Sequence, residues 1–248
     1  RGGAFPHPMA GLYRDEGVVL RTVKLGEADR IITIFTSEHG KVRAVAKGVR
    51  KSGSRFGARL EPPSNVAVQC YRGRDLDVVT QVECIDVFRA IREDYTNLTR
   101  AAAILEVVDQ LSPDREPNPA LHRMLVGALR TLDATPSPVI TPAFFWKALS
   151  LEGFHPFLEA CVRCGDTADE YPAIDLAEGG VLCPACGRLG GTRITPDGLA
   201  LLGLLVSGGL HRAMAEPPAP EAIVEVERLG IAALEHHSER RLRSAALL

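Results

Sequence analysis

Residues 17–49 read GVVLRTVKLGEADRIITIFTSEHGKVRAVAKGV, and this stretch decides the fold. Its segments 17–23 and 30–36 are rich in β-branched side chains, which favour β-strands. The pair His39-Gly40 marks a turn. In residues 41–47, small or branched apolar side chains then alternate with mostly basic ones, as in a strand with one buried face. The stretch therefore predicts three consecutive strands joined by short turns.

Two more strands are predicted in residues 65–71 and 75–84, on either side of the turn Arg72-Gly73-Arg74. Five short strands within about 75 residues, joined mostly by tight turns, are typical of a small antiparallel barrel or sandwich. A five-stranded Greek-key barrel of the OB type fits this count and spacing, and an SH3-like barrel fits almost as well. We assign the barrel to residues 10–88.

Beyond residue 88 the period of the apolar residues changes from two to 3.6, which predicts helices. Three pairs combine a residue that caps a helix N-terminus with a proline suited to the first helical position. These pairs are Asn118-Pro119, Thr141-Pro142 and Thr195-Pro196. After the sequence PPAP, a last amphipathic helix is predicted over residues 223–242. The expected fold class is α+β, in which the barrel precedes a helical domain in two parts, residues 89–156 and 195–248.

Four of the six cysteines form two CxxC pairs, each followed by a glycine. The candidate metal ligands are Cys161, Cys164, Cys183 and Cys186. Two such turns, with 18 residues between them, can place four thiolates around one tetrahedral ion, and this donor set suits zinc. A closed four-sulfur shell leaves no position for a catalytic water. We therefore expect one structural Zn²⁺, held by an element at residues 157–194 that is inserted into the helical domain.

Two disulfides, a redox-active pair and an iron–sulfur cluster are the alternatives for these four cysteines. Disulfides are rare in a reducing compartment, and a redox-active pair needs a thioredoxin-like βαβ unit, which is not predicted here. The ligands alone do not distinguish zinc from iron. The other two cysteines, Cys70 and Cys84, fall in predicted strands and are interpreted as small buried side chains.

The expected location is the cytoplasm. Residues 1–8 contain no apolar core of a secretory signal, and no apolar run reaches the roughly 20 residues of a membrane span. We expect residues 1–9 to be an upstream stub that takes no part in the fold, with Met9 as the native start.

The net charge of −2 conceals a basic stripe: residues 41–60, KVRAVAKGVRKSGSRFGARL, contain seven basic residues and no acidic one. Clustered Lys and Arg side chains on a barrel can neutralise DNA phosphates, and an aromatic ring in a loop can stack on an unpaired base. The candidate DNA-binding residues are Lys24, Arg30, Lys41, Arg43, Lys47, Arg50, Lys51, Arg55, Phe56 and Arg59. A solvated loop whose charge only aids solubility is the alternative.

No motif of a common enzyme class is present: the sequence has no Walker A, dinucleotide-binding glycine, GxSxG or HExxH pattern. Asp75 and Asp77 could in principle hold Mg²⁺ for nuclease chemistry, because alternation places both on one strand face. No further carboxylates accompany them. We interpret them as solvated charges beside Arg72 and Arg74, and we expect a non-catalytic protein.

Two stretches resemble the RecO family of bacterial recombination mediators. One is residues 17–62, which contain GEADRI, HGKVRAVAKG and SRFGARLEP, and the other is LEGFHPFLEACVRCG, residues 151–165. The resemblance extends in order from about Leu12 to Leu242 and includes CPACG. It implies an N-terminal OB domain, a helical domain and a zinc element.

The resemblance also implies a function in DNA repair and recombination. A member of this family would bind single- and double-stranded DNA, anneal complementary strands, and associate with the nucleoid. Its partners would be RecR and the acidic C-terminal tail of the single-stranded DNA-binding protein SSB, with RecA loaded indirectly on SSB-coated DNA. An apolar groove with a basic rim on the helical domain is expected to take that tail. Because some relatives lack the cysteines, zinc would stabilise the fold and would not be the source of the activity.

Two other classes of function remain open. The chain could be a scaffold that binds SSB or RecR without contacting DNA, which would show no direct, salt-sensitive binding of DNA. It could also be a zinc-ribbon RNA-binding or transcription factor, which would prefer RNA over single-stranded DNA.

Overall fold

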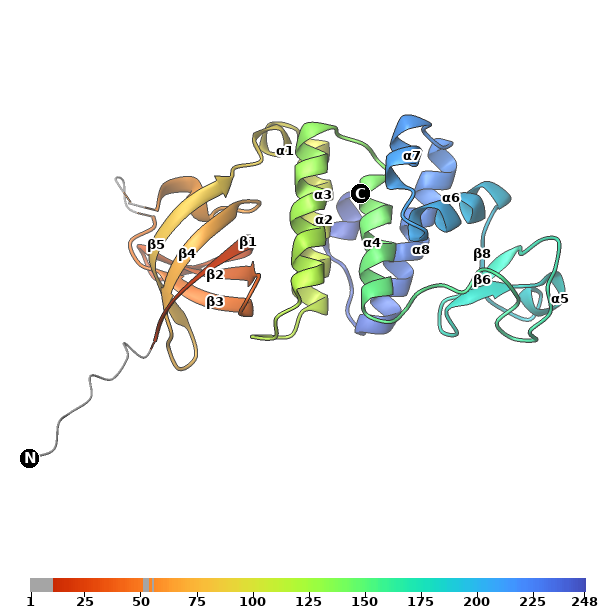
Figure 1. The fold of residues 1–248 in the computed structure, drawn as a ribbon, viewed down its shortest axis with the longest axis horizontal. Helices are drawn as coiled ribbons and strands as arrows, with labels where there is room; N and C mark the ends of the chain where they lie inside the picture. Colours follow the sequence, from red (N-terminus) through yellow and green to blue (C-terminus); the bar gives the residue numbers. More distant parts are fainter. Residues whose placement is uncertain (1–10, 51–53, 55) are drawn as a thin grey trace, which may run out of the picture. The chain divides into compact units, whose positions relative to one another are not determined.

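The computed structural model describes residues 11–50, 54 and 56–248 (Figure 1). The expected stub, together with Lys51 and Arg55, lies outside these residues. By their internal packing the residues form two compact units. The first runs through Arg89 and includes Ser112–Val126, and the second consists of Ala90–Leu111 and Gly127–Leu248. Each unit is described by itself.

The first unit is built on a closed five-stranded barrel (Figure 1). Its strands are β1 (Leu12–Leu25), β2 (Asp29–Thr36), β3 (Gly40–Ala46), β4 (Asn65–Tyr71) and β5 (Asp77–Asp86). The order around the barrel is β1-β2-β3-β5-β4, and every pair is antiparallel except β3 with β5. The predicted OB-type barrel is confirmed, with all five predicted strands present.

Alternation along the strands explains why the barrel closes around an apolar core. In β3, Val42, Ala44 and Ala46 point inward and are at most 1% exposed, whereas Lys41 and Arg43 point outward. β1 must pair with both β2 and β4, and its pairing with β2 is irregular between Val19 and Arg21. A β-bulge of this kind bends a strand, which lets one long strand serve both neighbours.

The last strand starts two residues later than the sequence predicted, at Asp77 instead of Asp75. The reason is local, because the Asp77 carboxylate accepts a hydrogen bond from the backbone N–H of Gly73 at 3.0 Å. This bond closes the turn and leaves Asp75 outside the strand, where its carboxylate meets Arg74 at 3.2 Å.

The second unit is mainly helical. Its helices are α1 (Arg89–Glu93), α2 (Tyr95–Leu111), α4 (Ile140–Leu151), α6 (Pro196–Val206), α7 (Leu210–Ala215) and α8 (Pro220–Ser238), and α3 (Pro119–Ala134) begins in the first unit and ends here. α4 is buried over most of its surface and packs against α2, α6 and α8. Trp146 of α4 donates a hydrogen bond to the Val226 carbonyl of α8 at 3.0 Å. No helix in the described part of the chain is long and apolar enough to cross a membrane.

Two of the three predicted helix starts are confirmed. Asn118 accepts a hydrogen bond from the Leu121 N–H at 3.0 Å, and Thr195 accepts one from the Gly198 N–H at 3.1 Å. The prediction at Thr141 is wrong, because α4 already begins at Ile140 and Thr141 is fully buried in its first turn. Burial of the apolar residues just before Thr141 extends the helix past the cap signal.

The end of the last helix also differs from the prediction, which placed it at residue 242. α8 ends at Ser238, because Glu239 adopts a left-handed conformation with φ of 54°. Residues 240–243 therefore leave the helix, and a single 3₁₀ turn, η2 (Ser244–Leu247), follows. Glycine is the usual residue at such a position, and no glycine stands here to signal the end.

Candidate functional site

The four cysteines of the two CxxC pairs come together in a small element of the second unit. Its sheet consists of β6 (Ala173–Asp175), β7 (Gly180–Leu182) and β8 (Thr192–Arg193), in the order β7-β6-β8. Cys161 and Cys164 lie in the loop before β6, Cys183 follows β7, and Cys186 lies in the short helix α5 (Pro184–Gly187).

The sulfur positions fit a single ion. All four Sγ atoms lie within 4.8 Å of one another, and the Sγ atoms of Cys164 and Cys183 are 3.8 Å apart. A tetrahedral site with metal–sulfur bonds of about 2.3 Å has sulfur–sulfur edges of about 3.8 Å. The expected gathering of the four cysteines is thus present, and the cluster could hold a metal ion.

Backbone N–H groups favour the thiolate form of one of the four cysteines. The N–H of Cys183 lowers the pKa of the Cys161 thiol to about 6, against the effect of burial and with help from the N–H groups of Cys164 and Arg163. The thiolate is the form that binds a metal. In the second knuckle, the Gly187 N–H donates to the Cys183 carbonyl at 2.8 Å and closes the turn.

Arg163 joins the two halves of the element. Its guanidinium lies 2.6 Å from the Asp175 carboxylate of β6 and donates to the Cys186 carbonyl at 3.2 Å. Gly180 brings the first knuckle close to β7, since a Cβ there would lie 2.2 Å from Val162 Cγ1. These contacts set the separation of the two knuckles before any ion binds.

The carboxylate pair considered for nuclease chemistry is not brought together as a metal site. Asp77 is fully buried and forms an ion pair with Arg115 at 2.8 Å, whereas Asp75 is exposed beside Arg74. The interpretation of Asp77 as a solvated charge is wrong. Its partner stands 38 positions away in the chain, which a local pattern does not reveal.

The predicted DNA-binding side chains that the structure describes lie on the barrel, and they differ in how exposed they are. Lys24, Arg43, Lys47, Arg50 and Arg59 are exposed. Arg50 is anchored, since it donates to the carbonyls of residues 26 and 27, at 3.3 and 2.9 Å.

Two of the predicted DNA-binding side chains are held in ion pairs. Arg30 is paired with Glu61, and Lys41 lies 3.6 Å from Asp114. Both are half-buried. These two are therefore less available to a phosphate than the exposed set.

The interpretation of Phe56 as a ring that stacks on an unpaired base is wrong. Its ring is 1% exposed and belongs to the barrel core together with Leu60 of the 3₁₀ turn η1 (Gly57–Leu60). A ring in that position cannot stack on a base. The glycines on either side of Phe56 suggested an open loop, but the end of the barrel needs an apolar closure, and Phe56 supplies it.

Strand register reveals surface residues that the sequence pattern missed. Arg21, Thr33 and Arg43 are cross-strand partners, so the two arginines flank Thr33 on the outer face of β1, β2 and β3. Arg21 is exposed. An irregular register in β1 hid this placement, because a bulge shifts the face to which each later residue points.

An apolar row runs beside these arginines. Val23, Ile31, Val45, Val78 and Tyr71 are successive cross-strand partners around the barrel. Val45 and Val78 each have buried neighbours on both sides in the sequence, so the row lies on the outside. Val23 is 48% exposed and Tyr71 50% exposed. The row therefore offers apolar surface and one available aromatic ring beside basic side chains.

Charge separates the barrel from the cysteine element. Residues 11–88 contain 13 basic and 10 acidic residues, whereas residues 157–194 contain three basic and six acidic residues. A cluster of four thiolates around a divalent ion adds further negative charge. The barrel segment thus has a net charge of +3 (13 − 10), and the cysteine element has one of −3 (3 − 6) before any thiolate is counted.

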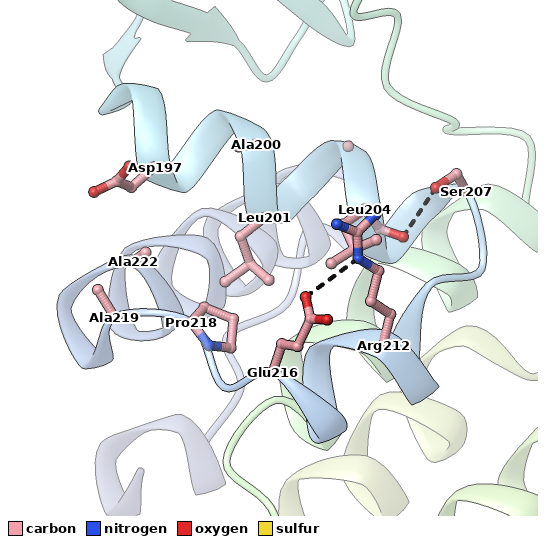
Figure 2. Close-up of a pocket in the computed structure, with 11 residues that line it drawn as sticks. Asp197, Ala200, Leu201, Leu204, Ser207, Arg212, Glu216, Pro218, Ala219 and Ala222 are labelled. Atoms are coloured by element: carbon pink, nitrogen blue, oxygen red, sulfur yellow. Dashed lines mark hydrogen bonds and ion pairs between the residues drawn. The ribbon is translucent and has the colours of Figure 1, made fainter.

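The described part of the second unit carries at least three grooves, two of which lie beside α6 or β8. The first, shown in Figure 2, has a volume of about 620 Å³ and lies between α6, α7 and the start of α8. Leu201 and Leu204 line it, but its one basic side chain, Arg212, is 3.6 Å from Glu216, and Asp197 adds a second carboxylate. This groove has an acidic rim.

The second groove, of about 670 Å³, lies between β8 and α8. Its apolar lining consists of Pro220, Val224, Leu229 and Ala232. Arg193 and Arg228 stand on its rim, exposed and without an ion-pair partner in the part of the chain that the structure describes. Two carboxylates also line it, but that of Glu225 accepts hydrogen bonds from the N–H and hydroxyl of Thr195.

Comparison with known protein families gives two matches that together span nearly the whole chain. A family model described as recombination protein O N terminal matches residues 9–88. A second, described as recombination protein O C terminal, matches residues 92–246.

Proposed function

The chain belongs to the recombination protein O family of DNA repair and recombination proteins, and from this membership we propose that it binds DNA on its barrel and anneals complementary strands. The protein makes and breaks no covalent bond. It acts as a mediator in the bacterial cytoplasm, at the nucleoid. The observation that supports this proposal best is the group of exposed basic side chains on the outer face of the barrel.

The proposed phosphate contacts are Lys24, Arg21, Arg43 and Lys47, because all four are exposed on the barrel. Each phosphate that they neutralise releases condensed counterions, which makes binding favourable and sensitive to salt. Arg50 anchors a turn and therefore contributes less to phosphate binding. Annealing follows from the same electrostatics, since neutralised strands repel one another less and approach more often.

Bases of an unpaired strand lie, in this proposal, against the apolar row of Val23, Ile31, Val45, Val78 and Tyr71. Tyr71 takes the role that the sequence had assigned to Phe56, because it is the half-exposed aromatic ring of that row. Every base has a face that can stack, so such contacts tolerate any sequence. The surface thus accounts for binding without sequence preference.

The first prediction concerns salt dependence. We expect the triple replacement Lys24→Ala, Arg43→Ala and Lys47→Ala to weaken single-strand binding at least tenfold. The slope of log K against log salt should fall by about two, since each lost phosphate contact removes about 0.7. The measurement is fluorescence anisotropy of a labelled oligonucleotide over a salt series. The variant Tyr71→Ala, measured in the same way, tests whether the ring stacks on bases.

A matched control removes three charges elsewhere: Arg123→Ala, Arg188→Ala and Arg212→Ala, all at exposed positions. This control triple should retain the salt slope of the unchanged protein. An unchanged slope in the barrel triple would contradict the proposal. Tighter binding to RNA of the same sequence would support an RNA-binding factor, and no direct DNA binding would support a scaffold.

We assign the cysteine cluster to one structural zinc ion, held by Cys161, Cys164, Cys183 and Cys186. The four-thiolate donor set, the 3.8 Å sulfur separation and the fixed knuckles support zinc, which favours closed tetrahedral sulfur sites. When bound, the ion supplies charge neutralisation and a cross-link between the knuckles. The acidic surroundings favour a position of this element outside the DNA contact.

The proposed partners are RecR and the acidic tail of SSB, with RecA loaded indirectly. For the tail, we favour the groove between β8 and α8, because beside its apolar lining stand two arginines that have no ion-pair partner among the described residues. An acidic peptide with a hydrophobic end needs both features. The groove of Figure 2 is a poorer match, since its arginine already faces Glu216.

A second prediction tests this partner site. We expect Arg193→Ala with Arg228→Ala to weaken binding of a peptide with the SSB tail sequence about tenfold or more, the effect of losing two charged contacts. Arg212→Ala, in the other groove, is the control and should bind normally. Isothermal titration of the two variants measures the difference. If only Arg212→Ala impaired binding, the tail would occupy the groove of Figure 2 instead.

A further inference from the structure

Three arginines lie together in the segment that follows α8. Arg240, Arg241 and Arg243 are all exposed, whereas Leu242 between them is 5% exposed and anchors the segment. The sequence pattern had placed the first three of these four residues on the final helix. The structure places them in an irregular turn that starts at Glu239.

The backbone of this turn is held in place by side chains of α2 and α8. Glu106 of α2 accepts hydrogen bonds from the N–H of Arg243 at 2.9 Å and of Ser244 at 2.7 Å, and from the Ser244 hydroxyl. Gln110 donates to the Arg241 carbonyl at 3.0 Å, and Glu235 of α8 accepts from the Leu242 N–H at 2.9 Å. The position of the turn is thus defined independently of its arginine side chains.

The arginine side chains themselves are uncommitted. None of the three guanidinium groups has an acidic partner within 4.0 Å among residues 11–50, 54 and 56–248. The nearby carboxylates of Glu106 and Glu235 are directed at backbone N–H groups, and Glu239 is exposed at the start of the turn. Three free guanidinium groups on a fixed backbone form a ready acceptor site for phosphates, which arginine binds through paired hydrogen bonds.

We propose that Arg240, Arg241 and Arg243 form a second DNA site, which holds the phosphate backbone of a second strand while the barrel holds the first. This inference rests on the proposed DNA binding by the barrel and adds a separate surface in the other unit. Annealing brings two strands together, and two basic surfaces on different units would let one molecule hold both and raise the rate further.

Phosphates fit this surface better than an acidic peptide with a hydrophobic end does. The three arginines line none of the three grooves found on the described residues of this unit. Leu242 is buried and offers no contact. A surface of guanidinium groups without an apolar pocket is suited to a repeating chain of charges.

The test measures capture of a second strand directly. The full-length protein is loaded with one donor-labelled single strand, and a non-complementary strand with an acceptor label is added, so that energy transfer reports binding of both. The unchanged protein should show energy transfer that fades with salt. The triple variant Arg240→Ala, Arg241→Ala and Arg243→Ala should bind the first strand within threefold of normal, lose at least nine-tenths of the energy transfer, and anneal at least tenfold more slowly.

Two further variants make the result specific. The control triple at Arg123, Arg188 and Arg212 lowers the net charge equally and should keep the energy transfer. Replacing the three arginines of the turn by lysine should restore most of it, because the charge remains. Thermal unfolding should be unchanged in all variants, since the turn is held by its backbone.

The outcomes separate this inference from the proposed function. If the triple variant of the turn captured the second strand normally, or if the control triple lost capture equally, the second site would be refuted and DNA binding by the barrel would stand. If the unchanged protein bound no first strand, the proposed function itself would fail, and the second site with it.

Discussion

Replacing Cys183 by serine is expected to release the metal ion and to unfold residues 157–194 while the rest of the chain stays folded. The core of the element is small. Its buried cluster consists of Cys161, Ala173, Leu182 and Cys183, so two of its four members are candidate ligands. Its longest strands have three residues. Without the cross-link by the metal, these contacts cannot offset the conformational entropy of about 38 residues.

The size of the effect follows from the energetics of closed zinc sites. In small zinc-dependent peptides the binding free energy is about 10–16 kcal/mol and appears as folding free energy. A whole domain is stable by only about 5–15 kcal/mol. Loss of one ligand should therefore convert the element from folded to unfolded, rather than weaken it slightly.

Three measurements check this prediction. Elemental analysis should give one zinc per chain in the unchanged protein and close to none in Cys183→Ser. Limited proteolysis should cut the variant within residues 157–194, and its thermal transition should fall. Cys84→Ser is the control, because Cys84 lies outside the cluster. Its thiol points at backbone carbonyls, to which a serine hydroxyl can also donate hydrogen bonds.

The same experiment decides between metals. An iron–sulfur cluster would colour the protein and bring iron and sulfide into the elemental analysis, whereas zinc leaves it colourless. If Cys183→Ser kept its full thermal stability with no bound metal, the structural assignment of the ion would be wrong.

Replacing Asp77 by alanine should lower the free energy of unfolding by about 3 kcal/mol. Removing one partner of a buried ion pair typically costs about 3–5 kcal/mol, and the Arg115 side chain is 37% exposed and can partly rehydrate, which favours the lower end. The loss also leaves the Tyr13 hydroxyl and the Gly73 N–H without their acceptor. Urea unfolding at pH 7 measures the change, and Asp75→Ala should differ from the unchanged protein by less than about 0.5 kcal/mol.

The contribution of Asp77 should depend on pH in a defined direction. Burial alone would raise the pKa of Asp77, but hydrogen bonds from Arg115, Tyr13 and Gly73 outweigh it and hold the pKa below its usual value. The stabilisation is therefore fully present above the unfolded-state pKa of about 3.9, and it is lost as the pH falls through the lower folded-state pKa. The stability difference between Asp77→Asn and the unchanged protein should shrink below about pH 4. A difference that stayed constant down to pH 2 would contradict the assignment of the charge to Asp77.

The parts of this molecule that could be predicted from sequence are those fixed by local pattern. Alternation in β3 identified the strand, and the CxxC spacing identified the cluster, because both depend on residues close together in the chain. Phe56 and Asp77 were misinterpreted for the opposite reason. Each looked exposed in its own segment, but Phe56 fills the end of the barrel and Asp77 meets Arg115 from a distant segment.

The surface residues that matter for the proposed function show the same limit. Arg21 depends on a bulge, since one extra residue in β1 decides which side chains face outward. The three arginines after α8 depend on where the helix stops. That end is set by Glu239 in a left-handed conformation and by Glu106 from another helix, and neither is visible in the periodicity of α8.

The division of the chain into units also has a consequence for how the protein is made. The first unit is complete only with residues 112–126, which supply Arg115 to Asp77, Asp114 to Lys41 and His122 to the Phe35 ring. A ribosome that has just released the last barrel strand must still add about 40 residues, or roughly 2–8 s of synthesis at bacterial rates, before these partners emerge. During that interval the nascent barrel carries a buried carboxylate without its counter-charge. A fragment cut after residue 88 would remain in that unfinished state permanently, so dissection of this protein for expression should keep the chain through Val126.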